Sequence, residues 1–514
     1  MNESNHSKST ILLISLTLLG RITGLFREMV LSYVYGTSSM SDAYSVAVTF
    51  STVVFAGIAV AILNGYIPSA VAEAQHGRLL SYTNGMLKTT ALIAYSLATG
   101  LLLALPLLIR IMARGFSMDA FSATIQLSRY IILAAPLLCF IELFAGYLQI
   151  KGQFWALPVQ SITENCILIG VFLIAAENAN HIGIGYGLAL VVPLLVIVWS
   201  SKRHGFSLES SEKSKEKVAE AWRLIFPTLG IQFATQINTV VDRSFASTLS
   251  EGTVSSLRYA SLLCDVVVSV FAASISMVRY PQIAIVMEKG NKDETAEAIS
   301  DTLDTLLLLI IPIAGFLLCS AHPVIKLMFE RGAFTAQNTA TTSVLLRLYT
   351  FSILCASIQE FLARVFLAAK KSKTLLGIQI MYVFLNICLN SLLIKSWGAG
   401  GLAAATSIAS VFPVVLMLAF LKRRYPAFDL TILGMRFIKS AAGVGAFLFT
   451  SFVVKAIIPL ATDGFFGVCI FLLETGILAI TVYIVCLVGL RDRTLLSLLR
   501  QFVSLLSRKR DPKQ

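Results

Sequence analysis

Long apolar stretches recur from one end of the chain to the other, separated by short polar segments. Each stretch is long enough to cross a hydrocarbon core roughly 30 Å thick as a helix. Backbone groups in lipid must find partners within their own segment, and the alternating pattern of a membrane β-barrel is absent, so we expect helices. The sequence therefore predicts an all-α polytopic membrane protein with fourteen transmembrane helices. The predicted spans are 10–35, 42–70, 86–113, 124–148, 154–177, 181–200, 222–247, 254–285, 302–327, 338–368, 374–395, 398–421, 434–459 and 464–490.

The composition agrees with this pattern. The chain has 514 residues, of which 56% are hydrophobic and 13% are charged, whereas a soluble domain carries about 25% charged residues. The first apolar run continues through Arg21 and Arg27 without a small-residue cleavage site, so we expect a first spanning helix and not a cleaved signal peptide. The eight cysteines are scattered through apolar runs without a C-x-x-C pair, which indicates small core residues and no metal or disulfide framework.

The basic residues are distributed unevenly over the predicted loops. If the N-terminus is cytoplasmic, most Lys and Arg fall on the cytoplasmic side, above all in 201–221 and in the tail 491–514, and the outer loops are nearly bare. This asymmetry predicts that both termini are cytoplasmic. It also explains the net charge of +13 as a topology signal and argues against a nucleic-acid partner. The stretch 494–506 is amphipathic, which predicts either a helix on the inner leaflet or an extension of the last span.

The two halves of the sequence resemble each other at an offset of 213 to 218 residues. Arg27 and Gly36 recur as Arg243 and Gly252, and other short motifs follow in the same order. An even number of spans separates equivalent positions, so the repeats are parallel, and a substrate site is expected in a central cavity between the two six-helix bundles. The predicted organisation is an N-terminal bundle (1–200), a cytoplasmic linker (201–221), a C-terminal bundle (222–421), two additional helices (422–490) and a basic tail (491–514).

Charged residues inside predicted spans are costly and should face a cavity or a partner. Arginine binds phosphate oxygens through two parallel hydrogen bonds, so arginines in the first helix predict a cationic cavity for an anion such as pyrophosphate. The alternative is an internal ion pair, such as Arg27 with Asp42 or Arg243 with its neighbouring aspartate. The candidate substrate-binding residues are Arg21, Arg27, Glu28, Asp42, Arg243 and Arg258.

Three segments are similar to a known family. The segments 20–28 (GRITGLFRE) and 41–44 (SDAY) resemble the opening of the MurJ/MviN family of lipid II flippases in the MATE-like (MOP exporter) superfamily, and 329–335 (FERGAFT) resembles one of its outer loops. The resemblance implies a V-shaped central cavity and alternating access. It implies a transporter in the bacterial cytoplasmic membrane, not an enzyme, which flips an undecaprenyl-pyrophosphate-linked cell-wall precursor. Membrane lipids and cell-wall synthesis proteins are the implied partners.

The resemblance also implies a sodium site. Its ligands would be Asp242, Asn386, Asn390, Leu402 and Thr406. Carboxylate, amide, hydroxyl and carbonyl oxygens suit a hard cation. The alternative is that the asparagines hydrogen-bond between helices and that the aspartate pairs with the arginine beside it.

Two departures from the family keep other functions open. The segment 48–60 lacks the basic residues of the family's second helix, and Leu262 stands where an arginine is common. A flippase for another lipid-linked oligosaccharide, of exopolysaccharide or O-antigen type, is therefore an alternative, as is a MATE-like drug or cation antiporter. A membrane-embedded glycosyltransferase would need catalytic carboxylates near a water-exposed loop, and a scaffold for cell-wall enzymes would have only 202–221 for docking. The sequence contains no G-x-x-x-x-G-K-[ST] motif, so we expect an ion, potential or substrate gradient to drive transport.

Overall fold

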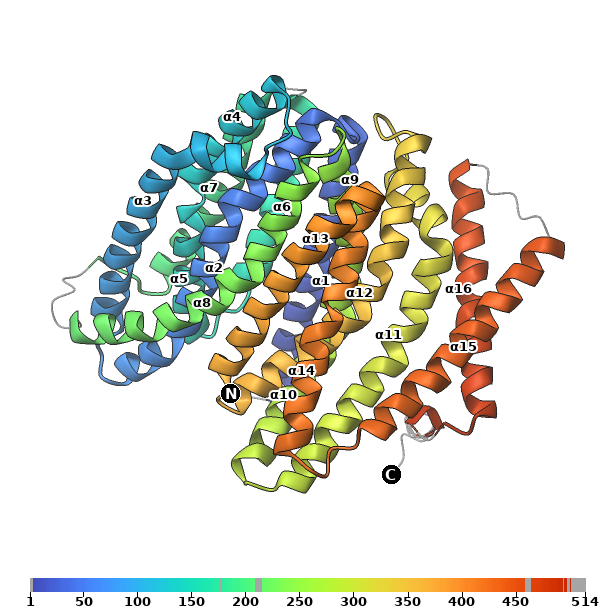
Figure 1. Cartoon of the computed structure of the whole chain (residues 1–514). Helices are drawn as coiled ribbons and strands as arrows, with labels where there is room; N and C mark the ends of the chain where they lie inside the picture. The colour runs from blue at the N-terminus through green and yellow to red at the C-terminus, as the bar shows by residue number, and fades with distance from the viewer. Residues whose placement is uncertain are drawn as a thin grey trace. The chain divides into compact units, whose positions relative to one another are not determined.

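The computed structural model describes residues 3–175, 178–208, 215–457, 464–492, 494–496 and 500, and it contains helices and no strands in these ranges (Figure 1). Eleven helical segments of the described chain are long and apolar enough to cross a membrane. One of them, Ser372–Arg424, contains two predicted spans. The helices α1 (Glu3–Tyr35) and α8 (Lys215–Ala246) contain two more, so the helical membrane fold is confirmed.

The helices are α1 (Glu3–Tyr35), α2 (Ser39–Gln75), α3 (Leu79–Met112), α4 (Met118–Ala134), α5 (Pro136–Ile150), α6 (Ala156–Ala175), α7 (Ala179–Arg203), α8 (Lys215–Ala246), α9 (Thr253–Val267), the π-helical turn η2 (Val268–Ala272), α10 (Ala273–Glu288), α11 (Lys292–Phe329), α12 (Ala336–Ala368), α13 (Ser372–Ala409), α14 (Val411–Arg424), α15 (Leu430–Ile457) and α16 (Gly464–Gly489).

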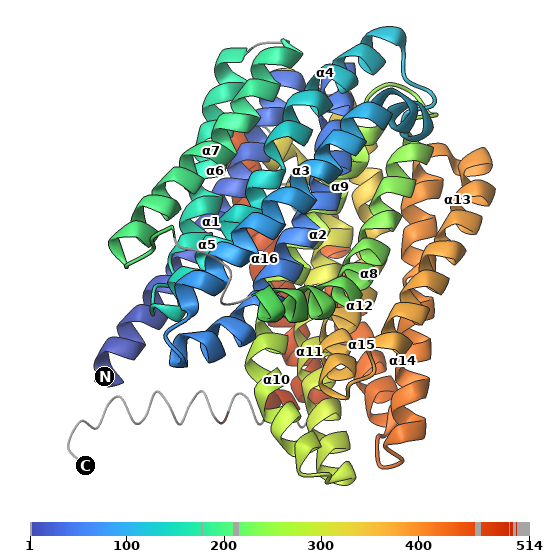
Figure 2. The same ribbon diagram turned by 90° about the vertical axis from the view of Figure 1, so that its left-hand side faces the viewer.

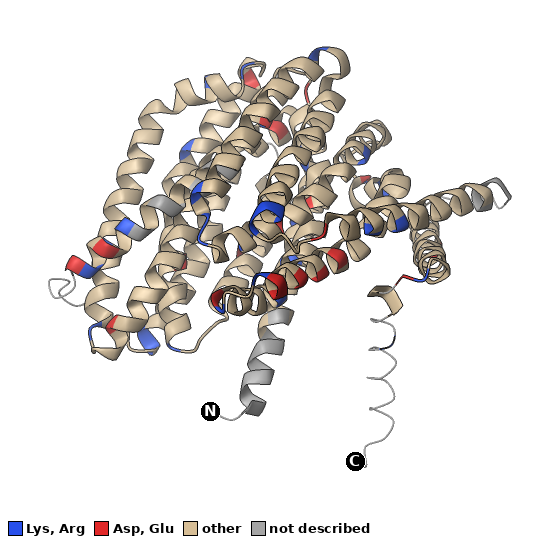
Figure 3. Ribbon diagram, turned by 60° about the horizontal axis from the view of Figure 1, so that its bottom comes forward, with Lys and Arg blue, Asp and Glu red and all other residues tan. Residues whose placement is uncertain are grey.

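Polar side chains fix where several helices begin. The hydroxyl of Ser38 accepts a hydrogen bond from the backbone N–H of Ser41 at the start of α2, and Ser117 does the same for Ala120 in α4. These caps satisfy backbone donors that have no partner within the helix. The chain is charged mainly near helix ends, and long parts of the ribbons carry no charge (Figure 3).

Contacts divide the chain into two compact units. The first unit comprises 1–255 with 331–335, and the second comprises 256–330 with 336–514. In the first unit, α2 packs against α4, α5 and α8, and α1 packs against α6 (Figure 2). The indole N–H of Trp222 on α8 donates to the hydroxyl of Thr89 on α3 over 2.9 Å. The predicted domain limits, which begin the second bundle at residue 222, stay a prediction.

The second unit contains a buried ion cluster that joins three segments. Arg436 on α15 donates through Nη2 to Oδ2 of Asp304 on α11 over 2.7 Å, and its Nη1 lies 2.7 Å from the carboxylate of Asp492. Arg436 is 4% exposed, Asp304 6% and Asp492 2%. The hydroxyl of Thr494 also donates to Asp304. The cluster therefore fixes α11, α15 and the segment after α16 to one another.

Candidate functional site

The first candidate cluster lies on α1 of the first unit. Arg27 donates through Nη2 to Oε1 of Glu28 over 2.7 Å, and the two side chains are 21% and 2% exposed. Glu164 on α6 is close enough to interact electrostatically with Arg27. The Nε–H of Arg27 is buried and has no hydrogen-bond partner in the structure. A buried donor without an acceptor is costly, so one hydrogen-bonding group of this guanidinium is not satisfied by Glu28.

Arg21 lies on the same helix, and its side chain is exposed. Arg27 follows six positions later, which corresponds to about 240° around the helix axis at 3.6 residues per turn. The two arginines therefore share no narrow face, and no residue in the described part of the chain forms an ion pair with Arg21.

The second cluster surrounds Asp42, at the start of α2. Its Oδ2 accepts a hydrogen bond from the backbone N–H of Gly252 over 2.8 Å, and Oδ1 accepts one from Ser255 over 2.7 Å. Since α9 begins at residue 253, Asp42 caps α9 from another helix. Glu251 does the reverse, because its Oε1 accepts from the backbone N–H of Ser39 in the first turn of α2 over 2.6 Å. The starts of two helices at equivalent repeat positions thus cap each other.

The loops around these caps meet at a site that we call the loop junction, defined by Gly36, Gly115, Gly252 and Gly332. Gly252 has a positive φ of 81°, and a Cβ there would collide with the carbonyl oxygen of Thr37. Similar backbone contacts join Gly115 to the end of α8 and Gly332 to the end of α1. At the loop junction, loops from each half of the sequence therefore contact backbone from the other half. These close contacts require glycine, because any Cβ at these positions would collide with the facing backbone.

The remaining predicted substrate residues lie on α8 and α9. Arg243 donates through Nη1 to the carbonyl oxygen of Val254 over 2.7 Å, and it is close enough to Asp42 to interact electrostatically. The structure thus brings Arg243 and Asp42 together around the start of α9. Arg258 is half-buried and belongs to the second unit.

Four of the predicted sodium ligands gather on α13. Asn386 and Asn390 are buried, and Nδ2 of Asn390 donates to Oδ1 of Asn386 over 2.8 Å. Nδ2 of Asn386 donates to Oγ1 of Thr406 over 3.4 Å, and that hydroxyl donates to the carbonyl oxygen of Leu402 over 3.1 Å. Asp242 lies in the first unit, where Asn238 donates to it over 3.3 Å. The donor set on α13 is rich in oxygen and fits a hard monovalent cation by its chemistry.

Sequence reasoning missed three features. The ion pair of Arg27 with the adjacent Glu28 and the cap that Glu251 provides were not predicted. The only signal for them in the sequence is that all three residues are charged. Arg436 was not recognised as part of a buried cluster, although an arginine within an apolar span is a signal for a buried partner.

The comparisons with known proteins agree with this architecture. The family model described as "Lipid II flippase MurJ" matches residues 31–475. The chain belongs to the lipid II flippase MurJ family. Proteins described as probable lipid II flippases MurJ from Bdellovibrio bacteriovorus and Rhizobium meliloti are 24% and 26% identical to it, covering 85% and 79% of this chain and 86% and 78% of theirs.

The solved structures extend the match to the fold. A lipid II flippase MurJ in an inward closed conformation superposes with a TM-score of 0.80 at 25% identity, covering 94% of this chain and 99% of that one. An inward-facing multidrug transporter of the MATE family and MOP superfamily reaches 0.65 at 15% identity, covering 81% and 98% of the two chains, which shows a common fold. The MurJ family is a family of transporters, so the predictions of a transporter and of the family are confirmed.

Proposed function

We propose that this chain flips lipid II, an undecaprenyl-pyrophosphate-linked cell-wall precursor, from the inner to the outer leaflet of the bacterial cytoplasmic membrane by alternating access. The observation that carries this proposal is the family match over residues 31–475, supported by the structural likeness to a lipid II flippase at a TM-score of 0.80. The local chemistry supports an anionic headgroup, since the Arg27 side chain is 21% exposed and its Nε–H has no acceptor.

In this proposal the six predicted residues have different tasks. Arg27 and Arg21 on α1 supply donors for pyrophosphate oxygens, and Glu28 holds the Arg27 guanidinium in place over 2.7 Å. Asp42 and Arg243 act around the loop junction, where Asp42 caps α9. Arg258 on α9 supplies another cation. Opening the protein at the loop junction would require the Asp42 caps to break, so these caps set part of the cost of changing conformation.

We place both termini and the segment 201–221 in the cytoplasm, and the loop junction at the outer side. The basic ends of α7 and α14, which carry Lys202, Arg203 and Lys422 to Arg424, support this orientation. Ser211 lies outside the described residues and offers a labelling site. A Ser211→Cys variant should react with a membrane-impermeant thiol reagent only from the cytoplasmic side. Labelling from the outside alone would reverse the topology.

Sodium coupling is a further part of the proposal. Asn386, Asn390, Leu402 and Thr406 would supply neutral oxygens, and Asp242 would supply the single charge, which suits a monovalent ion. When bound, the ion would change the affinity of the protein for its substrate, so that the sodium gradient would drive transport.

Cell-wall synthesis proteins are proposed partners, because the product of flipping is their substrate.

Complementation tests the function. The chain should restore growth to a bacterium depleted of its own lipid II flippase, whereas an Arg27→Ala variant present at the same membrane level should not. An Arg114→Ala variant, altered at an exposed arginine in the α3–α4 loop of the same unit, should restore growth like the unmodified chain. If the unmodified chain reaches the membrane and fails to restore growth, lipid II is not its substrate, and a different lipid-linked glycan becomes the candidate.

A further inference from the structure

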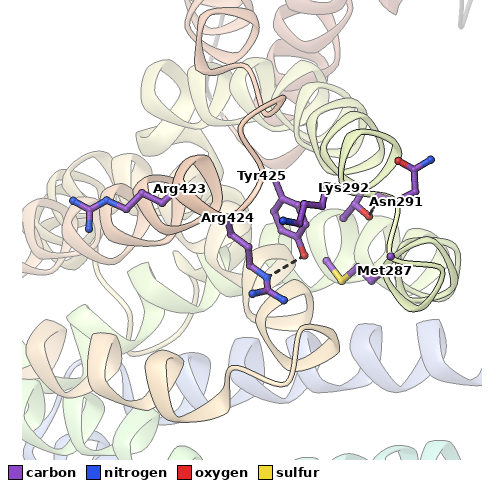
Figure 4. A pocket seen from close by; sticks show the side chains of 8 residues that line it. Met287, Asn291, Lys292, Arg423, Arg424 and Tyr425 are labelled. Atoms are coloured by element: carbon purple, nitrogen blue, oxygen red, sulfur yellow. Dashed lines mark hydrogen bonds between the residues drawn. The ribbon is translucent and has the colours of Figure 1, made fainter.

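Charged side chains on the surface of the second unit need no partner, because water solvates them. Lys292 and Arg424, for example, line a groove of about 340 Å³, and both side chains are exposed (Figure 4). A charge inside a helix bundle is different, because burying it without a partner is costly. In the first unit, Glu142 on α5 is such a residue, and it is the only charged residue between Arg129 and Lys151.

Glu142 has neither a hydrogen-bond partner nor an ion-pair partner in the described part of the chain. Its Oε2 is buried and unpaired, whereas the side chain as a whole is half-buried. The thiol of Cys139, one turn earlier on α5, lies close enough to interact electrostatically with the carboxylate. A thiol carries no positive charge, so an ionised Glu142 would stay uncompensated at this place.

The helix α2 covers the carboxylate on one side. Cys139 and Gly146 lie three residues before and four residues after Glu142, so all three share one face of α5. The Cys139 thiol donates to the carbonyl oxygen of Phe55 over 3.8 Å, and a Cβ on Gly146 would lie 2.8 Å from the ring of Tyr66. Glu142 therefore lies between two contacts with α2, opposite the apolar stretch of α2 that begins at Phe55.

The other helices that pack against α5 supply no cation either. They are α3, α4, α6 and α7. The charged and histidine residues of α2 and α7 lie near the ends of these helices. Lys88 on α3 and Arg129 on α4 are exposed, and neither forms an ion pair with Glu142. Glu164 on α6 accepts a hydrogen bond from Gln160 over 2.5 Å.

Two tyrosines also approach this part of α5. The hydroxyl of Tyr66 on α2 is hydrogen-bonded to the hydroxyl of Thr83 over 2.7 Å. The ring of Tyr95 on α3 lies 6.1 Å from the ring of Phe140. Neither tyrosine is hydrogen-bonded to Glu142, so the unpaired oxygen remains without a donor in the described structure.

The second half of the sequence shows how the equivalent position is neutralised. The segment 142–145 (ELFA) recurs as 360–363 (EFLA) in the repeat. On α12, Glu360 pairs with Arg364, one turn later, over 2.7 Å. The position equivalent to Arg364 is Gly146, where the ring of Tyr66 leaves no room for a side chain. The first unit therefore keeps the carboxylate of the repeat and lacks its cation.

We propose that Glu142 is a proton-binding site, at which a proton from water neutralises the carboxylate as Arg364 neutralises Glu360. The neutral acid is the form that suits the packed interface of α2 and α5, and the ionised form is favoured only when water reaches both carboxylate oxygens. The pH therefore acts on how firmly α2 packs against α5. The site uses none of the proposed sodium ligands, and it does not rest on the identity of the flipped molecule.

Infrared difference spectroscopy of the purified full-length chain in lipid vesicles tests the charge state, because a protonated carboxyl group and a carboxylate absorb in separate bands. At neutral pH, the unmodified chain should show a protonated-carboxyl band that Glu142→Gln removes. The matched control is Glu360→Gln, which should remove a carboxylate band instead, because Glu360 is ion-paired. If Glu142→Gln removes a carboxylate band at neutral pH, the proposal is wrong.

Unfolding in mixed micelles at several pH values tests the link with packing. A group that keeps its proton in the folded state and loses it in the unfolded state makes the folded state less stable as the pH rises. Above about pH 4.3, where an exposed glutamate ionises, the unfolding constant of the unmodified chain should therefore rise relative to that of Glu142→Gln by about tenfold per pH unit. The unmodified chain should show no such rise relative to Glu360→Gln.

A ratio of the unfolding constants of the unmodified chain and Glu142→Gln that does not change with pH would overturn the proposal. A Glu142→Asp variant keeps an acid at the site and should keep a protonated-carboxyl band at neutral pH. This variant separates the loss of the acid from a general loss of structure. A carboxylate band from Glu142→Asp in the folded protein would also count against a proton site.

Discussion

Asp42 gives the most quantitative prediction. Its two carboxylate oxygens accept backbone hydrogen bonds from Gly252 and Ser255 over 2.8 and 2.7 Å, and its side chain is 3% exposed. In Asp42→Ala both donors lose their acceptor in a buried place. Each such loss costs about 1–3 kcal/mol, so the free energy of unfolding should fall by about 2–6 kcal/mol.

Asp42→Asn separates the two bonds. The amide oxygen can replace one carboxylate oxygen, but the NH₂ group would face the second N–H donor and cannot accept from it. We therefore expect about half of the alanine effect, roughly 1–3 kcal/mol. The matched control is Asp119→Asn, which alters an exposed acid in the first turn of α4 in the same unit. That change loses only the interaction with the helix dipole, about 0.3–1 kcal/mol.

The assay is reversible unfolding of each purified variant in mixed micelles titrated with a denaturing detergent, followed by tryptophan fluorescence. The expected order of destabilisation is Asp42→Ala, then Asp42→Asn, then Asp119→Asn. If Asp42→Asn and Asp119→Asn cost the same, the reciprocal caps do not stabilise the protein, and the loop junction is held by other contacts.

Three further predictions concern other parts of the molecule. Arg21→Ala and Arg27→Ala should abolish growth rescue at normal membrane level, and lysine should rescue only partly because it lacks the paired donors of arginine; full rescue by both alanine variants would remove the anion site. Arg436→Met removes the cation shared by two buried carboxylates and leaves only Lys439, 3.8 Å from Asp492, beside them, so it should lower the unfolding free energy by about 3–5 kcal/mol in the same unfolding titration; an unchanged value would show that the cluster is not stabilising. Asp242→Asn should abolish sodium dependence of flipping in proteoliposomes, and transport that is independent of sodium before the change would disprove the coupling.

The pattern of apolar residues predicted the helical fold, but several helices extend beyond the predicted spans. The span predicted to begin at residue 302 is part of α11, which begins at Lys292, because its acidic first turns continue the helix beyond the apolar stretch. The spans 374–395 and 398–421 follow each other almost without a loop, and the chain turns at Gly398, where φ is 52°. Hydropathy measures transfer into lipid, so it does not report helices that extend into water.

The candidate site was predictable in its residues but not in its contacts. Arg27 was expected to pair with Asp42 or to bind an anion, yet its carboxylate partner is the adjacent Glu28. Asp42 caps a helix 210 residues away in sequence, a contact that only the tertiary fold creates. The repeat suggested that the starts of α2 and α9 are equivalent, but it carried no information that they would cap each other.

Transport of lipid II into the outer leaflet of proteoliposomes tests the central claim most directly. Purified chain is reconstituted with fluorescent lipid II, and the fraction exposed outside is measured with a membrane-impermeant quencher in vesicles that contain the unmodified chain, Arg27→Ala or Arg114→Ala. The account predicts rapid exchange of lipid II with the unmodified chain and with Arg114→Ala, and little above empty vesicles with Arg27→Ala. Exchange that is equal in all three proteins, or absent with the unmodified chain, would contradict it.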